Sequence, residues 1–183
     1  ASLSKDEDLI RALIEERIRE GNYYAALAQI QTLPAEVAVV AALRADILRH
    51  LESPQAESWY RALQGSCLSG RAEHGLGLIA AQRGDYRQAV QKAAAAVLMP
   101  TDSRVRNDLG FIYLHVSMDR EAEFELRTAS ELAPDDRIPV FNLALLALLR
   151  SDNDAWRDWS ERSRFAESEQ KELVRSCQYL MRK

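Results

Sequence analysis

The sequence predicts an all-α fold, a right-handed α-solenoid of about five helical hairpins followed by a C-terminal capping helix. Two observations lead to this prediction. Apolar residues recur with the period of a helix along the chain, and no segment shows the alternation that is typical of a strand. A short motif also recurs at nearly constant spacing, because Leu76-Gly77 precedes Leu109-Gly110 by 33 residues and Leu143-Ala144 follows by 34.

The most complete copy of the motif lies between residues 101 and 136. Leu109 and Tyr113 are four residues apart, so they share one face of a first helix. Gly110 and Ala122 are small, which lets the backbones of two paired helices approach closely. Its other motif residues belong to the second helix and its end, and they are Leu126, Ala129 and Pro134.

This order of a Leu-Gly pair, an aromatic residue, small residues and a closing proline resembles the tetratricopeptide repeat (TPR). Arg106 stands where the TPR pattern prefers tryptophan. The resemblance covers nearly the whole chain as one solenoid domain, residues 1–183. Its units and its cap are expected at about 4–34, 35–66, 70–100, 101–136, 137–166 and 167–183.

Within these units the pattern predicts helices whose ends are marked by capping residues and prolines. Ser4 is a candidate N-cap before an acidic first turn, Pro34 ends the second helix and Pro54 suits a first turn. Two glycines and two serines make residues 65–70 the predicted flexible joint. The expected helices are about 4–20, 23–33, 35–50, 54–63, 71–83, 86–99, 103–116, 120–132, 137–150, 153–164 and one from 168 onward.

Composition and charge narrow the class of function. The chain has 183 residues, 47% hydrophobic and 28% charged, with a net charge of −4. It therefore offers no excess of basic residues for nucleic acid.

The longest apolar run, residues 138–149, is shorter than the roughly 20 residues of a membrane span. Cys67 and Cys177 lie in distant repeats, so we expect two free thiols. The chain begins at Ala1, which we interpret as a trimmed start or a removed leader.

The sequence predicts no enzyme, cofactor or metal site. The Gly-x-Gly string at residues 75–80 follows the predicted joint rather than a strand, so Gly77 is interpreted as a close-packing glycine. His50, His74 and His115 lack the spacing of zinc ligands. Trp156 and Trp159 lie on one helical face and are interpreted as packing residues.

An apolar stripe left over after core assignment predicts a groove for a partner protein. In TPR proteins the first helices of the repeats line the concave side, and several of them here are apolar on a second face. The alternative is that the terminal helix or a second copy of the chain covers this stripe. The predicted groove residues are Ala38, Ala41, Ala45, Leu48, Leu78, Arg104, Asn107, Phe111, Leu114, Ile138, Phe141, Asn142, Leu145 and Leu148.

Arg104, Asn107 and Asn142 resemble part of the carboxylate clamp of chaperone-binding TPR domains. Arg71 is the other basic residue nearby, and two further basic side chains of the clamp are missing. We therefore expect an apolar or amphipathic partner segment rather than a C-terminal carboxylate.

At a finer level the array resembles the TadD-type lipoproteins of Flp/Tad pilus assembly, which are similar in role to pilotins. This resemblance implies a secretin or pilus component as partner and a place at the periplasmic face of the bacterial outer membrane, with any lipid anchor outside residues 1–183. The alternatives are a cytoplasmic TPR chaperone of a secretion system, or a self-associating scaffold such as a homodimer.

Overall fold

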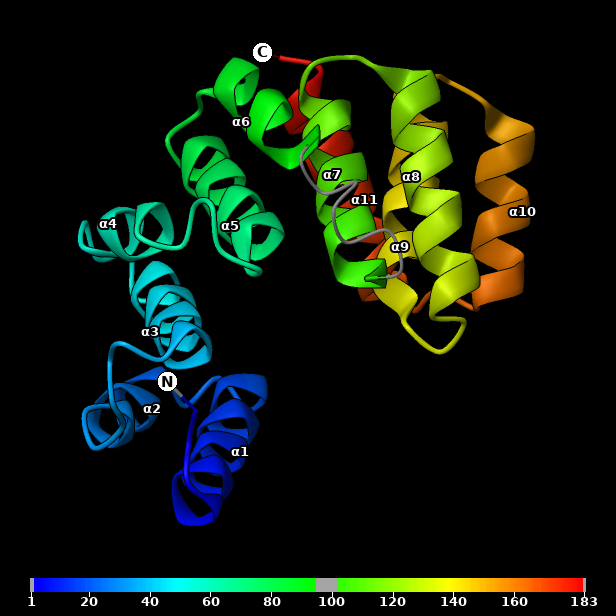
Figure 1. The fold of residues 1–183 in the computed structure, drawn as a ribbon. Helices are drawn as coiled ribbons and strands as arrows, with labels where there is room; N and C mark the ends of the chain where they lie inside the picture. Colours follow the sequence, from blue (N-terminus) through cyan, green and yellow to red (C-terminus); the bar gives the residue numbers. More distant parts are fainter. Residues whose placement is uncertain (1, 95–101, 183) are drawn as a thin grey trace. The chain divides into compact units, whose positions relative to one another are not determined.

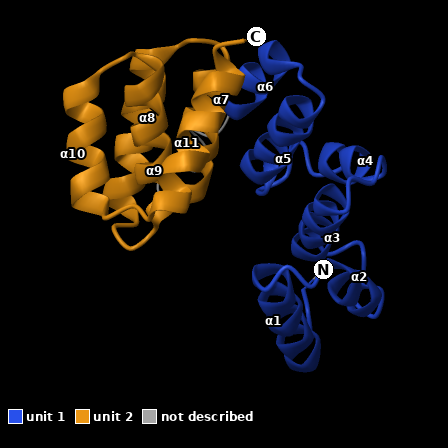
Figure 2. Ribbon diagram, turned by 180° about the vertical axis from the view of Figure 1, so that it is seen from behind, with its two compact units in different colours: residues 1–98 blue, residues 99–183 orange. Residues whose placement is uncertain are grey.

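A computed structural model of the chain describes residues 2–94 and 102–182. The described residues form helices joined by turns (Figure 1). The chain divides into two compact units, residues 1–98 and residues 99–183 (Figure 2).

The described residues of unit 1 form three helical hairpins. Helix α1 pairs with α2, α3 with α4, and α5 with α6, and each hairpin packs against the next. The bounds of these helices are α1 Lys5–Arg19, α2 Tyr23–Ile30, α3 Ala38–His50, α4 Ala56–Arg61, α5 Ser69–Gln82 and α6 Tyr86–Ala93.

Between residues 102 and 182, unit 2 contains two hairpins and a last single helix. Helix α7 pairs with α8 and α9 with α10, while α11 packs against α9. The bounds are α7 Ser103–His115, α8 Asp119–Leu132, α9 Arg137–Leu149, α10 Asn153–Ser163 and α11 Glu167–Leu180.

This arrangement confirms the predicted all-α fold of consecutive helical hairpins. Several boundaries differ from the expectation: α3 begins at Ala38 rather than at residue 35, and α4 spans Ala56–Arg61 rather than residues 54–63. Helix α2 ends at Ile30 rather than at residue 33, and α5 begins at Ser69, inside the predicted flexible joint. Helix α6 ends at Ala93, and the rest of the helix expected up to residue 99 lies outside the described residues. The single-domain assignment stays a prediction.

Aspartate caps begin several of the helices, as the sequence pattern favours. The carboxylates of Asp85, Asp102, Asp136 and Asp152 each accept a hydrogen bond from a backbone N–H in the first turn of α6, α7, α9 or α10. Ser4 forms a capping box with Glu7 at α1. These side chains satisfy donors that have no partner inside the helix.

Close backbone approach within a hairpin depends on the motif glycines. A Cβ atom on Gly110 would lie 2.6 Å from Cγ of Leu126 and 3.3 Å from the carbonyl oxygen of Ala122. A Cβ on Gly77 would lie 3.2 Å from the backbone nitrogen of Ala93. The interpretation of Gly77 and Gly110 as close-packing residues is therefore confirmed.

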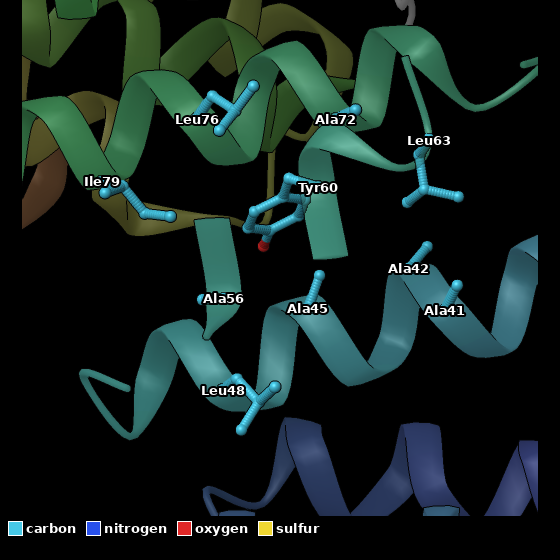
Figure 3. Packing of buried hydrophobic residues seen from close by; sticks show 10 residues of the cluster. All are labelled: Ala41, Ala42, Ala45, Leu48, Ala56, Tyr60, Leu63, Ala72, Leu76 and Ile79. Atoms are coloured by element: carbon cyan, nitrogen blue, oxygen red, sulfur yellow. The ribbon is translucent and has the colours of Figure 1, made fainter. Parts of the chain in front are cut away.

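Tyr60 is the centre of the core in unit 1. Its side chain is fully buried between α3 and α5, surrounded by alanine and leucine side chains (Figure 3). Its hydroxyl donates a hydrogen bond of 2.5 Å to Oδ1 of Asp46, and the other carboxylate oxygen of Asp46 accepts from Arg71. A Cβ on Gly75 would lie 2.2 Å from the Tyr60 ring. The ring therefore occupies the space that only a glycine leaves on α5.

We expect the Gly75→Ala substitution to destabilise the protein by about 1–3 kcal/mol, the range of an overpacked core. The Tyr60 ring is rigid and its hydroxyl is held by Asp46, so it has no easy way to move aside. The free energy of unfolding, measured with urea, tests this. The comparison is Gly77→Ala, in which the new methyl group lies 3.2 Å from its nearest neighbour. This variant should lose less free energy of unfolding than Gly75→Ala. An equal loss in both variants would contradict the argument.

An ion pair replaces the expected tryptophan contact in the hairpin of α7 and α8. Nη1 of Arg106 lies 3.0 and 2.7 Å from the two carboxylate oxygens of Glu125. The two side chains are only 13% and 11% exposed. A charge this buried is tolerated because the opposite charge is adjacent.

Replacing one member of this pair should therefore lower the free energy of unfolding more than replacing both members with apolar residues. We expect Glu125→Gln to lower the free energy of unfolding by about 3–5 kcal/mol, since it removes the carboxylate charge that lies against the buried Arg106 guanidinium. The double variant Arg106→Met with Glu125→Leu should lie much closer to wild type. Urea unfolding of Arg106→Met alone, of Glu125→Leu alone and of the double variant completes a double-mutant cycle with wild type. Additive losses would show that the pair does not act as a unit.

Candidate partner-binding pocket

Unit 2 contains an open pocket of about 460 Å³ between α7, α9 and α11. Three helices therefore supply its walls, and two of them are first helices of their hairpins. Its lining combines aromatic and aliphatic side chains with a few polar ones, namely Phe111, His115, Phe141, Asn142, Leu145, Glu172, Arg175, Ser176, Tyr179 and Leu180.

The apolar floor of this pocket belongs to α9. Leu145 is 1% exposed and belongs to the core of unit 2. Phe141 is half-buried and meets Phe165 edge-on, with ring centroids 5.9 Å apart. The floor is therefore continuous with the core of unit 2, since Leu145 belongs to the core cluster and Phe141 packs against it.

Helix α11 forms one wall because its own apolar face is docked on α9. Leu173 and Cys177, one turn apart, are buried in the same cluster as Leu145. At the start of α11, Glu169 pairs with Arg137 of α9 at 3.1 Å, and the Arg137 guanidinium lies over the Phe165 ring. The C-terminal capping helix predicted from the sequence thus covers part of the apolar stripe on α9.

The opposite wall is Phe111 of α7, which is 39% exposed. Its ring meets the His115 ring edge-on at 4.9 Å. Tyr179, on α11, is 59% exposed at the rim. An apolar group of a partner would therefore lose water contact between aromatic rings on two helices.

A buried amide pair lies beside the floor. Nδ2 of Asn142 donates a hydrogen bond of 2.9 Å to Oδ1 of Asn107, and the two residues are 6% and 8% exposed. The pair joins α9 to α7. Nδ2 of Asn107 donates instead to Asp108, and the Arg104 side chain is 79% exposed beside Asp102. That these residues do not capture a C-terminal carboxylate stays a prediction. Arg71 pairs with Asp46 instead.

In unit 1 the predicted groove residues belong mainly to the core. Ala41, Ala45 and Leu48 are buried with Tyr60 in one cluster, so their assignment to an exposed groove wall is corrected (Figure 3). The physical reason is that α4 and α5 both pack against α3, which therefore has two faces to bury. Ala38 and Leu78 are half-buried.

In unit 2 the structure brings together Phe111, Phe141, Asn142 and Leu145 of the predicted set. Leu114 is buried at 5% exposure, so it supports the pocket from within rather than lining it. Leu148 is half-buried, and Ile138 is 59% exposed away from the lining. Whether any of these residues contacts a partner stays a prediction.

Sequence reasoning missed the contribution of α11. Its lining residues are Glu172, Arg175, Ser176, Tyr179 and Leu180. A signal was present, because the apolar residues of this helix recur at i, i+4 and i+7 and so give it a face that must dock on something. The sequence could not show against which helix this apolar face packs.

The described part of the chain shows no group of three or more His, Cys, Asp or Glu side chains that could hold a metal ion. Nor does any helix within residues 2–94 and 102–182 have the length and apolar character to cross a membrane. Trp156 and Trp159 are half-buried against the core of unit 2, in agreement with their interpretation as packing residues.

The two cysteines are free, as expected, and their surroundings differ. Cys67 is exposed, whereas burial of Cys177 on the face of α11 that packs against α9 raises the pKa of its thiol. Because the thiolate is the reactive form, we expect a thiol reagent near neutral pH to label Cys67 quickly and Cys177 slowly. Mass spectrometry of the labelled chain over time measures both rates. In urea the two rates should converge, and rapid labelling of Cys177 in the folded chain would show that α11 is not docked.

The chain is similar in sequence to the TPR repeat-containing protein PA4299 of Pseudomonas aeruginosa, with 39% identity over 153 residues. The match covers 83% of this chain and 62% of the relative, so the chain spans less than two thirds of the relative's length. No protein-family model matches the chain.

Comparison with solved structures identifies the fold of the chain. A structure of PilF from Pseudomonas aeruginosa superposes with a TM-score of 0.68 at 20% identity, covering 85% of this chain and 73% of that one. MamA from Desulfovibrio magneticus RS-1, from residue 41 to its end, gives a TM-score of 0.60 at 16% identity, covering 99% and 98%. Identities this low establish the fold alone. The chain therefore has a TPR-like fold.

Proposed function

We propose that this chain is a non-enzymatic adaptor that holds an apolar or amphipathic segment of another protein in the pocket between α7, α9 and α11. The observation that carries the proposal is a hollow of about 460 Å³ with aromatic rings on α7, α9 and α11 and an apolar floor that is continuous with the core of unit 2. Ligand sites in proteins have this composition, apolar walls with a few polar groups at the rim.

The energy of binding comes chiefly from the walls. Phe111 and Tyr179 remain 39% and 59% exposed in the free chain, so a bound segment removes further apolar area from water. Burying one large apolar side chain of the partner contributes about 1.5–3 kcal/mol. A few such side chains, with the rim polar groups, give a specific complex without any chemistry of the chain itself.

Phe111 is the residue with which to test this function, because it lines the pocket and is not part of the core cluster. We expect Phe111→Asp to abolish binding, since it places a charge against the apolar group of the partner. The measurement is quantitative mass spectrometry of proteins captured from the native organism by wild type and by the variant. A protein lost with the variant is then purified and its affinity measured by calorimetry.

The matched control is Phe124→Asp, which changes an equally large and even more exposed phenylalanine, on α8 and outside the pocket. It should leave capture and affinity unchanged. Circular dichroism of both variants checks that they fold. Equal affinity of Phe111→Asp and wild type for the purified protein would end the proposal.

At a finer level we propose that the captured protein is a secretin or pilus component, in a pilotin-like role. The resemblance of the repeats to TadD-type lipoproteins supports this, together with the likeness of the fold to that of PilF. The periplasmic face of the outer membrane follows from this role. Capture of a cytoplasmic secretion substrate by the same pocket would instead support the chaperone alternative.

A further inference from the structure

The pocket between α7, α9 and α11 has two opposite charges on its α11 wall. Glu172 and Arg175 both line the pocket, and both side chains are exposed. They are three residues apart and Tyr179 follows four residues later, so the three side chains lie along one side of α11. A segment bound in the pocket therefore meets a carboxylate and a guanidinium as well as aromatic rings.

Neither charge has an ion-pair partner in the part of the chain that the structure describes. Elsewhere in the chain, acidic and basic residues with the same spacing and order do pair within their helices, and these pairs are Asp8–Arg11, Glu16–Arg19 and Asp154–Arg157. Glu169, which lies three residues before Glu172, is paired with Arg137 of α9. The charges of Glu172 and Arg175 are consequently available to a bound molecule.

The apolar part of the pocket favours an aromatic side chain. Phe111, Phe141 and Tyr179 contribute aromatic rings from three different helices. The two phenylalanines each meet another ring of the chain edge-on, so edge-on contacts are already built into the walls. Because aromatic rings gain from such contacts beyond the area that they bury, an aromatic side chain of the partner binds here better than an aliphatic one.

The floor of the pocket excludes a charged anchor. Phe141 and Leu145 form it, and the amide of Asn142 beside them already donates to α7. A charge placed on this floor would lose its water without meeting an opposite charge. The charged groups of a bound segment therefore belong at the rim, next to Glu172 and Arg175.

We propose that the segment held in this pocket has an aromatic anchor, flanked by a basic residue that pairs with Glu172 and an acidic residue that pairs with Arg175. The inference rests on the proposed function and specifies the partner of the same site. A purely apolar segment would cover both charges of α11 without pairing them, which is unfavourable. The anchor supplies most of the affinity, and the two charges select the segment and fix its direction.

Selection from a library of displayed random peptides on the full chain tests this inference. Wild type should enrich peptides with one aromatic residue and a basic and an acidic residue in constant order beside it. The variant Glu172→Arg with Arg175→Glu should enrich peptides in which the two charges exchange places. The matched control is Glu131→Arg with Arg120→Glu on α8, two exposed positions outside the pocket, and it should enrich the same peptides as wild type.

The affinity of one peptide selected on wild type, measured by fluorescence anisotropy, gives the size of the effect. The charge-exchanged protein should bind this peptide about tenfold more weakly, because like charges then meet at both contacts. Exchanging the two charges of the peptide as well should restore most of the affinity. The difference should shrink in high salt, since the contacts lie at the exposed rim. Circular dichroism of each variant confirms folding.

Two results would overturn this inference while leaving the proposed function intact. One is enrichment of apolar peptides without any order of charges, and the other is an order that stays the same in the charge-exchanged variant. The proposed function itself fails if wild type enriches no peptides, or if Phe111→Asp binds the enriched peptides as tightly as wild type. The two failures are therefore told apart by the same set of variants.

Discussion

The closeness of the two helices within a hairpin is the constraint on which the rest of the structure depends. At Gly77 and Gly110 the space for a side chain is taken by the backbone or a side chain of the paired helix. At Gly75, where two neighbouring hairpins meet, the same space is taken by the Tyr60 ring of α4. Because backbones this close leave little freedom, each hairpin presents its remaining faces at fixed positions. Two of the pocket walls in unit 2, on α7 and α9, are such faces, and the third is α11, which is docked on α9. The pocket is therefore already formed in the free chain.

Much of this fold could be predicted from the sequence. The spacing of Leu-Gly pairs gave the hairpins, and proline and aspartate positions gave most helix ends, because both signals act within one or two turns. The burial of Glu125 against Arg106 could not be predicted, since it depends on which side chain of α8 lies opposite the position where tryptophan is usual. Local patterns do not report such pairs across a hairpin.

The candidate site was predicted less well than the fold, for a physical reason. A helix that is apolar all round has two surfaces to cover, but its sequence does not say what covers the second. The second apolar face of α3 is covered by α4 and α5, which bury Ala45 and Leu48. The second face of α9 is partly covered by α11, whose Leu173 and Cys177 are buried in the same cluster as Leu145. Surplus apolar residues thus indicate contacts in general, whether made by the chain or by a partner.

The position of α11 decides where a partner of unit 2 can bind. Its apolar face is docked on α9 by buried residues, and the Glu169–Arg137 pair fixes its beginning. The stripe under this helix is consequently closed to other molecules unless the helix leaves. What stays open is the strip between Phe111 on α7 and Tyr179 near the end of α11, where both rings are still partly in water. A partner segment there would contact the cap as well as the repeats, so specificity depends on the C-terminal helix, whose residues the repeat motif does not constrain.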